Sequence, residues 1–328
     1  MMETRHTRRG KKRRRRLRPF RTLFALLVVL AIAVGLYSVW QYNQGRELAT
    51  GEKPDSGPFS GDPIDPQYPY IENYLLLGID DDGSERSRSD TMILASLDKE
   101  NNKVRLVSFM RDIYADIPGY QSYKLNTAYY LGEAQLAKDT ITGMFGVPIH
   151  HYAVTDFDNF EKLIDIAAPN GVRIDVEKPM SERIGVSLTK GTHDLNGKEL
   201  LGYARFRADS EGDFGRVERQ QKVISALKDE ILSPGTIPRL PKLAGAATGY
   251  VETDVNGIAG LRKVLRAAVT GGVEIERMTI PVKGTYQFNT YPNVGSVIEI
   301  DVPANREALA EFLGTPEVMK GASARLMP

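Results

Sequence analysis

The sequence contains no cysteine and only four histidines among its 328 residues. The lack of cysteine excludes disulfide bonds, thiolate metal sites and a cysteine nucleophile. Three common catalytic motifs are also missing, namely the G-x-x-x-x-G-K-[ST] phosphate loop, H-E-x-x-H and the G-x-S-x-G elbow. The chain must therefore rely on an apolar core for stability, which its length permits, and on carboxylates and basic side chains for chemistry.

Two weak metal-binding patterns can be set aside. The triplet Asp80 to Asp82 before Gly83 resembles a calcium loop, but the glutamate that such a loop requires would fall near Thr91. His150 and His151 lie inside the apolar run PIHHYAV, which favours a structural role over metal ligation.

One long apolar run stands out, because residues 22–40 (TLFALLVVLAIAVGLYSVW) carry no charge. Its length is close to the roughly 20 residues that cross a bilayer, and Trp40 and Tyr42 suit the membrane interface. Residues 1–21 contain eleven arginines and lysines, which predicts a cytoplasmic N-terminus. We interpret the run as a transmembrane helix in the cell membrane. A cleaved secretory signal is the alternative, but no convincing A-x-A site follows the run.

Charge separates the N-terminal tail from the rest of the chain. After residue 21 there are 32 basic and 41 acidic side chains, so the part predicted to lie outside the cytoplasm is acidic. The position of the basic tail beside a membrane span argues against a nucleic acid as partner. Residues 41–70 are rich in Gly, Pro, Ser and Asp without apolar periodicity, which predicts an extracytoplasmic linker. We predict a tail at 1–21, a span at 22–40, the linker at 41–70 and a catalytic domain at 71–328.

The domain alternates between strand and helix patterns. Strands are predicted at 74–79, 91–97, 104–110, 172–176, 203–207 and 278–282. Helices are predicted at 126–144, 156–168, 217–232, 257–268 and 306–313, the second with an acidic N-cap. This interleaving predicts a layered α/β domain with helices on both faces of a largely buried sheet.

Charged side chains gather in the loops after the first and third predicted strands. Asp80 follows the first strand, and Arg111 follows the third in the segment SFMRD. These residues would meet at one edge of the sheet only if the two strands run parallel. The loop after Asp80 also contains RSRSDT (residues 86–91), whose mixture of charges is compatible with salt bridges alone but also suits a metal ion beside a phosphate.

Two later segments add basic groups. If YARFR (residues 203–207) is a strand, Arg205 and Arg207 project from one face, which is costly unless an anion lies between them. The alternative is an exposed edge strand with solvated arginines. On the helix that follows, Arg216 and Gln220 share one stripe near its first turn, where backbone N–H groups favour an anion. An ordinary amphipathic helix start is equally compatible with that pattern.

Several of these motifs occur in an order that closely resembles the LytR-CpsA-Psr family of Gram-positive cell-wall enzymes. The resemblance runs from about Asn73 to Leu232 and on toward the C-terminus. The segments that carry it are LLLGID, RSDTMIL, VSFMRDIYADIPG, KLNTAYYLG, HYAVTDFDNF, LNGKELLGYARFR and DFGRVERQQ.

The resemblance implies an α/β/α sandwich with a central mixed β-sheet and an apolar pocket for a polyprenyl chain. It implies an arginine-lined pyrophosphate site with Mg²⁺, or Mn²⁺ in its place. The implied activity is phosphotransfer that attaches an anionic glycopolymer, such as teichoic acid or capsule, from a polyprenyl-pyrophosphate-linked precursor to peptidoglycan.

Roles carried over by the resemblance fall on matching positions. Asp80 and Asp90 correspond to the metal site, and with Arg88 and Arg111 they form the implied catalytic group. The implied pyrophosphate clamp consists of Arg86, Arg88, Arg111, Lys124, Arg205, Arg207, Arg216 and Gln220.

This chain departs from the family pattern at two positions. Asp82 stands where the family often has an arginine, which puts one phosphate contact in doubt and suggests Arg86 as its replacement. Met110 stands where the family often has proline, and this change concerns only the local backbone.

Two other functions use the same features. A hydrolase that cleaves polyprenyl pyrophosphate would need the same clamp but no glycan acceptor. A non-catalytic protein that binds wall polymer and acts through the cytoplasmic tail would depend on residues 1–18 rather than on Asp90. The sequence leaves both alternatives open.

Overall fold

The computed structural model describes residues 19–49, 53–80, 87–209, 211–257, 260 and 274–315. Contacts divide the chain at Trp40 into two units, residues 1–40 and 41–328. The first described element is helix α1 (Pro19–Leu48), which includes the predicted span and ends in the second unit. Residues 41–48 therefore form the end of this helix, where the sequence predicts linker.

Within the described residues, no helix has both the length and the apolar character that crossing a membrane requires. The side chains of Thr22, Ala25 and Leu26 lie outside the description, as does the basic tail up to residue 18. The transmembrane span at 22–40 thus stays a prediction.

A six-stranded mixed sheet forms the centre of the second unit, in the order β10-β3-β2-β1-β6-β9. β1 and β3 both pair antiparallel with β2 and therefore run parallel to each other, while β6 is parallel to β1 and β10 is parallel to β3. The sheet strands are β1 (Ile71–Asp80), β2 (Arg88–Asp98), β3 (Lys103–Phe109), β6 (His151–Asp156), β9 (Glu252–Thr253) and β10 (Glu274–Ile280). The condition for Asp80 and Arg111 to meet at one edge is satisfied.

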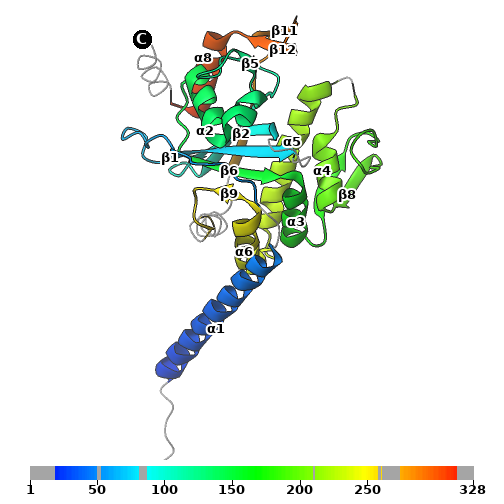
Figure 1. Ribbon diagram of the computed structural model, residues 1–328. Coiled ribbons are helices and arrows are strands. Elements are labelled where there is room, and N and C mark those ends of the chain that lie inside the picture. The colour runs from blue at the N-terminus through cyan, green and yellow to red at the C-terminus, as the bar shows by residue number, and fades with distance from the viewer. Residues whose placement is uncertain are drawn as a thin grey trace, which may run out of the picture. The chain divides into compact units, whose positions relative to one another are not determined.

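Helices cover both faces of this sheet (Figure 1). One face packs on α2 (Asn126–Phe145) and α8 (Val302–Leu313). The other lies toward α3 (Phe157–Ala167), α4 (Gly197–Arg205), α5 (Gly212–Ile231) and α6 (Leu240–Tyr250). The predicted α/β sandwich with a central mixed sheet is therefore confirmed.

Side-chain alternation along β1 and β2 assigns residues to these two faces. Leu75, Leu77 and Leu94 are almost completely buried in a core cluster that includes Ala137, Ile141 and Phe145 of α2. The residues between them face the other helices, where Ile93 belongs to a much smaller buried cluster. Burial of a core side chain of this size stabilises the fold by about 1.5–3 kcal/mol, so the α2 face carries most of the apolar stabilisation.

Smaller elements complete the second unit. Among the described residues, three two-stranded sheets lie outside the central sheet. They pair β4 (Tyr114–Ala115) with β5 (Tyr123–Lys124), β7 (Val172–Val176) with β8 (Gly191–Leu195), and β11 (Tyr286–Tyr291) with β12 (Gly295–Ile300). A short 3-10 helix, Ile237–Arg239, precedes α6.

Most predicted elements are found near their predicted limits. Asp156 caps α3, because its side chain accepts a hydrogen bond of 2.7 Å from the backbone N–H of Asn159. The greater part of the helix predicted at 257–268 lies outside the described residues. The hairpin of β11 and β12 was not predicted.

The strand predicted at 203–207 is wrong. Asn196 and Glu199 form a capping box that starts α4, and this helix continues to Arg205 before Phe206 turns into an extended conformation. Leu200, Tyr203 and Ala204 are buried at helical spacing, so packing favours the helix. Arg205 and Arg207 are therefore not adjacent residues on one strand face.

Residues 53–70, predicted as part of a linker, pack on the domain. Asp62 exchanges two hydrogen bonds of 2.8 Å with Ile149, and Lys138 forms an ion pair of 2.7 Å with Asp62. Ser60 donates its backbone N–H to Gln135 at 2.7 Å. The described part of this segment is thus attached to α2 and to the loop before β6, and the predicted domain limits remain predictions.

Candidate functional site

A cavity of about 770 Å³ lies between the central sheet and helices α3, α4 and α5. The lining residues deeper along the strands and helices are apolar, and they include Leu76, Ile93, Ala153, Phe160, Leu201 and Val223. The lining residues at the carboxyl edge of β1 are charged or polar. We call this second group the polar end of the cavity: Asp80, Asp90, Arg205, Arg207, Asp213, Arg216 and Gln220.

The two aspartates reach the cavity for different reasons. Asp80 is the last residue of β1 and shares a face with Leu76 and Gly78 by simple alternation. Asp90 reaches it through a β-bulge, because Gly78 pairs with Thr91 while Ile79 pairs with Ser89. The extra residue lets Asp90 and Thr91 both line the cavity, as bulges beside active sites often do.

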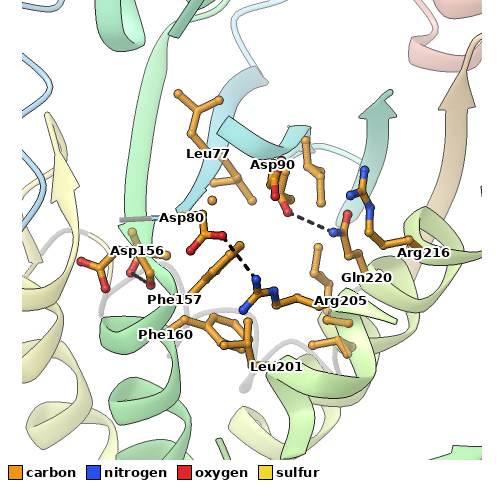
Figure 2. Close-up of a pocket in the computed structure, with 18 of the residues that line it drawn as sticks. Leu77, Asp80, Asp90, Asp156, Phe157, Phe160, Leu201, Arg205, Arg216 and Gln220 are labelled. Atoms are coloured by element: carbon orange, nitrogen blue, oxygen red, sulfur yellow. Dashed lines mark hydrogen bonds and ion pairs between the residues drawn. The ribbon is translucent and has the colours of Figure 1, made fainter. Parts of the chain in front are cut away.

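Helix ends supply the basic side chains (Figure 2). Arg205, at the end of α4, lies 3.3 Å from Asp80 and 4.5 Å from the ring centre of Phe157. The guanidinium thus joins a carboxylate on the sheet to an aromatic side chain on α3. Gln220 on α5 donates a hydrogen bond of 3.0 Å to the hydroxyl of Thr91, which ties α5 to the bulge.

A network of four side chains lies at the start of α5. Arg111 donates a hydrogen bond of 2.6 Å to Asp90, Arg216 forms an ion pair of 3.1 Å with Asp213, and Arg111 lies 3.9 Å from Asp213. Burial alone lowers the pKa of Arg111, but Asp90 and its other acidic neighbours outweigh burial and leave that pKa raised. The two guanidiniums therefore share Asp213 as a counter-charge.

Arg216 differs from Arg111 because its positive charge is poorly compensated. Only 5% of the residue is exposed, and its Nε, like the Nε of Arg111, makes no hydrogen bond with any described residue. Burial lowers the pKa of Arg216, and the nearby charge of Arg111 lowers it further. An anion beside Arg216 would supply the missing partner.

The structure gathers most of the predicted site residues at this cavity. Six of them line it, namely Asp80, Asp90, Arg205, Arg207, Arg216 and Gln220. Arg111 does not line the cavity but is bonded to Asp90, which does. Two others do not line it: Arg88 has its guanidinium 5.6 Å from the ring of Tyr130, and Lys124 is bonded to Asp112 at 2.8 Å. Arg86 lies outside the described residues. The roles of all these residues remain predictions.

Two residues that build or support the site, Asp213 and Arg219, were not predicted from the sequence. Asp213 comes three residues before Arg216 on a helix, a spacing that joins opposite charges and was available as a signal. Arg219 is 2% exposed, and it bonds Asp209 at 3.1 Å and the carbonyl oxygen of Phe206 at 2.8 Å. Arg219 thereby fixes the loop that carries Arg207. No local sequence pattern predicts such a contact.

The described residues contain no cluster of three or more acidic or histidine side chains placed to hold a metal ion. Asp81 and Asp82 lie outside that description. Mg²⁺ is commonly held by one or two carboxylates together with substrate phosphates, so Asp80 and Asp90 fit an ion that arrives with a phosphate ligand. Each of these two carboxylates has a guanidinium partner in the structure.

Comparison with known proteins identifies the class to which this fold and cavity belong. Residues 48–306 match the LytR_cpsA_psr family, and the chain belongs to this family. The crystal structure of TagV from Bacillus subtilis is similar, with a TM-score of 0.63 and 28% identity over 74% of this chain and 97% of TagV.

Two curated relatives differ in what their names say. Regulatory protein MsrR of Staphylococcus aureus strain COL is 42% identical over 284 residues, which cover 85% of each chain. The polyisoprenyl-teichoic acid–peptidoglycan teichoic acid transferase TagU of Enterococcus faecalis is 34% identical over 245 residues, 72% of this chain and 79% of TagU. The family thus includes teichoic acid transferases.

Proposed function

We propose that this protein transfers an anionic glycopolymer, such as teichoic acid or capsule, from a polyprenyl-pyrophosphate-linked precursor to peptidoglycan. The observation that carries the proposal is the division of one cavity into an apolar part and a polar end with three arginines. A polyprenyl diphosphate has the same division, with a hydrocarbon chain attached to a highly charged head. The names and family membership of TagU and TagV support the same class of reaction.

The diphosphate would bind at the polar end. Arg216 is buried beside Arg111 with an unsatisfied Nε, so an incoming anion relieves the repulsion between the two guanidiniums. Arg205 and Arg207 approach from α4 and the loop behind it. The apolar lining then accepts the part of the polyprenyl chain nearest the phosphates, because removing that surface from water is favourable.

The reaction would be an in-line displacement at the phosphorus nearer the polymer. The oxygen of a peptidoglycan hydroxyl forms a new bond to this phosphorus, the bond to the bridging oxygen breaks, and polyprenyl phosphate leaves. Of the two aspartates, Asp80 is better suited than Asp90 to accept the hydroxyl proton, although a metal-bound carboxylate is a poor base unless its pKa rises. The side chain of Asp80 is 48% exposed and 3.3 Å from Arg205, whereas Asp90 is held at 2.6 Å by Arg111.

Asp80 and Asp90 would also hold Mg²⁺ or Mn²⁺ when the diphosphate is present. Such an ion supplies positive charge to the phosphate oxygens. The arginines described above position the same oxygens, so the protein contributes orientation and charge on both sides of the diphosphate.

We further propose that residues 22–40 anchor the protein in the cell membrane with the domain on the outer side. The eleven basic residues before this run support that orientation. In α1, the apolar side chains of Leu23, Phe24 and Leu36 are 56%, 70% and 68% exposed, so no described part of the chain covers them. Alkaline extraction of membranes and protease accessibility of the domain in intact cells test this arrangement.

A transfer assay tests the enzymatic proposal. The full chain in detergent, supplied with a polyprenyl-diphosphate-linked glycopolymer, Mg²⁺ and peptidoglycan glycan, should give a phosphodiester-linked product. Arg205→Ala should reduce product formation strongly. Release of polymer at an equal rate without any glycan acceptor would identify the protein as a hydrolase instead.

The name of MsrR favours a second candidate, a regulatory protein without catalysis. In that case deletion of residues 1–18 should abolish the cellular phenotype, while Asp90→Ala should leave it intact. The transferase proposal predicts the opposite pattern for these two variants.

A further inference from the structure

One exposed and two half-buried aromatic side chains lead from a hairpin to the start of α5, which carries Asp213 and Arg216 of the polar end. The hairpin is that of β11 and β12, in which residues 287–290 are exposed. Phe288 is 67% exposed, more than any other large apolar side chain that the structure describes outside α1. A single exposed apolar side chain is ordinary on a protein surface, but Phe288 also contacts a neighbouring aromatic ring, and this continuity suggests an interaction site.

Ring contacts connect Phe288 to the site. The ring of Phe288 meets the ring of Tyr286 edge-on at 5.8 Å, and Tyr286 lies 5.3 Å from Phe214. Phe214 directly follows Asp213, the shared counter-charge of Arg111 and Arg216. We call Phe214, Tyr286 and Phe288 the aromatic row.

Backbone contacts hold the hairpin against the same part of the site. The N–H of Ile298 on β12 donates to the carbonyl oxygen of Asp112 at 2.8 Å, and Ile298 bridges to Ile113. On the other side of the hairpin, Tyr291 stacks on Tyr114 at 4.9 Å. The hairpin therefore has a fixed position relative to Arg111.

A groove of about 570 Å³ runs beside this hairpin. Its polar lining groups include the side chains of Thr285, Gln287, Glu299 and Asp301, alongside the rings of Tyr114 and Tyr286. The charged residues among its described lining, Glu299 and Asp301, are both acidic, which disfavours a phosphate-rich polymer. Hydroxyl and amide groups of an uncharged sugar could bond to these polar atoms, while its C–H face packs on an aromatic ring.

We propose that the aromatic row and the adjoining groove bind the glycan strand of the peptidoglycan acceptor. This inference rests on the proposed transferase function and deepens it by placing the acceptor. The anionic donor occupies the arginine-rich end of the cavity, and the N-acetylhexosamine strand approaches from the acidic, aromatic side. The arginines of the polar end attract the phosphates of the donor, whereas the acidic groove repels them, and this difference separates donor from acceptor.

The test measures binding of a soluble N-acetylglucosamine oligosaccharide to the full chain in detergent, without donor. Phe288→Ala should weaken binding about ten-fold, and Tyr286→Ala should weaken it by at least as much. Phe288→Leu is the matched control, since it keeps an apolar side chain but removes the ring. A stacking role predicts that it binds almost as poorly as Phe288→Ala.

Transfer kinetics separate this inference from the proposed function. Phe288→Ala should raise the KM for the glycan acceptor about ten-fold, with no change in affinity for the donor lipid. Wild-type transfer with an unchanged acceptor KM in Phe288→Ala would overturn the acceptor site but leave the transferase intact. If the protein binds the oligosaccharide through Phe288 but shows no transfer activity, the acceptor site stands and the transferase function is overturned. An oligomeric state that depends on Phe288 would identify a second copy as the occupant and overturn the inference.

Discussion

The two faces of the central sheet are built from the same strands but are used differently. Toward α2 and α8, the side chains form one large buried cluster around Leu75, Leu94 and Phe145. Toward α3, α4 and α5, the helices bury a second cluster of their own, which includes Ile164, Leu200 and Tyr203, and a cavity of about 770 Å³ lies between these helices and the sheet. Close packing contributes most of the stability on the first face, so the second face can remain open for a ligand.

The largest expected effect comes from breaking the packed face. Phe145→Ala removes a fully buried ring that lies 5.1 Å from the ring of Phe109 and should lower the free energy of unfolding by about 3–5 kcal/mol. Phe160→Ala on the cavity side is the matched change and should cost about 1 kcal/mol. Urea unfolding of the full chain in detergent measures both. Equal losses would contradict the division between the faces.

Removal of a guanidinium from the polar end should affect activity next most strongly. Arg216→Ala should reduce the transfer rate about 10²–10³-fold, because a buried donor to the reacting phosphate is lost. Arg173→Ala serves as control, because Arg173 does not line the cavity. Its side chain is 75% exposed and is bonded to Asp194 across the pair of β7 and β8. The transfer rates of both variants are measured, and circular dichroism confirms that each variant is folded. Wild-type rates in Arg216→Ala would remove this residue from the site.

A filled cavity would sharpen the comparison further. Ala153→Phe on β6 points a ring into the cavity and should weaken binding of polyprenyl phosphate about ten-fold while changing stability by less than about 1 kcal/mol. Ala137→Phe on the packed face has no such space and should destabilise the fold by about 1–3 kcal/mol. Lipid binding and urea unfolding are measured on each variant. Loss of stability without loss of lipid binding in Ala153→Phe would refute the proposed occupant.

The smallest expected effect is a pH dependence of the folding stability that arises from the buried His150. Burial, with the neighbouring His151, lowers the pKa of His150 below its usual 6.5, and its Nδ1 accepts a 2.8 Å bond from the N–H of Asn73. The unfolded chain then binds this proton more readily than the folded chain. Stability should be complete above about pH 6.5 and decline below it, by at most about 1.4 kcal/mol per pH unit.

His150→Asn tests this expectation, because an asparagine oxygen can accept the same bond without titrating. Unfolding between pH 5 and 7 should show a shallower pH dependence in this variant than in the unsubstituted protein. An unchanged slope would show that another group is responsible.

Several parts of the fold and the site could be predicted from local sequence. The period of the apolar residues located most strands and helices, and Asp156 was a readable cap. YARFR was misread because two arginines at alternate positions suggested a strand. The capping box of Asn196 and Glu199, seven residues before Tyr203, was the signal for a helix. The bulge at Asp90 and the contacts of Arg219 depend on residues distant in the chain, so no local pattern contains them.

By itself, the sequence determined the residue types at the site, the resemblance to the family and the alternation of elements, because near neighbours in the chain decide periodicity and caps. Only the tertiary structure decided that β1 and β3 run parallel, that Arg216 is buried beside Arg111, and that one sheet face stays open. The hairpin beside Asp112 also became visible only there. Each of these features results from pairing and packing between segments far apart in sequence, where burial and charge act through space rather than along the chain.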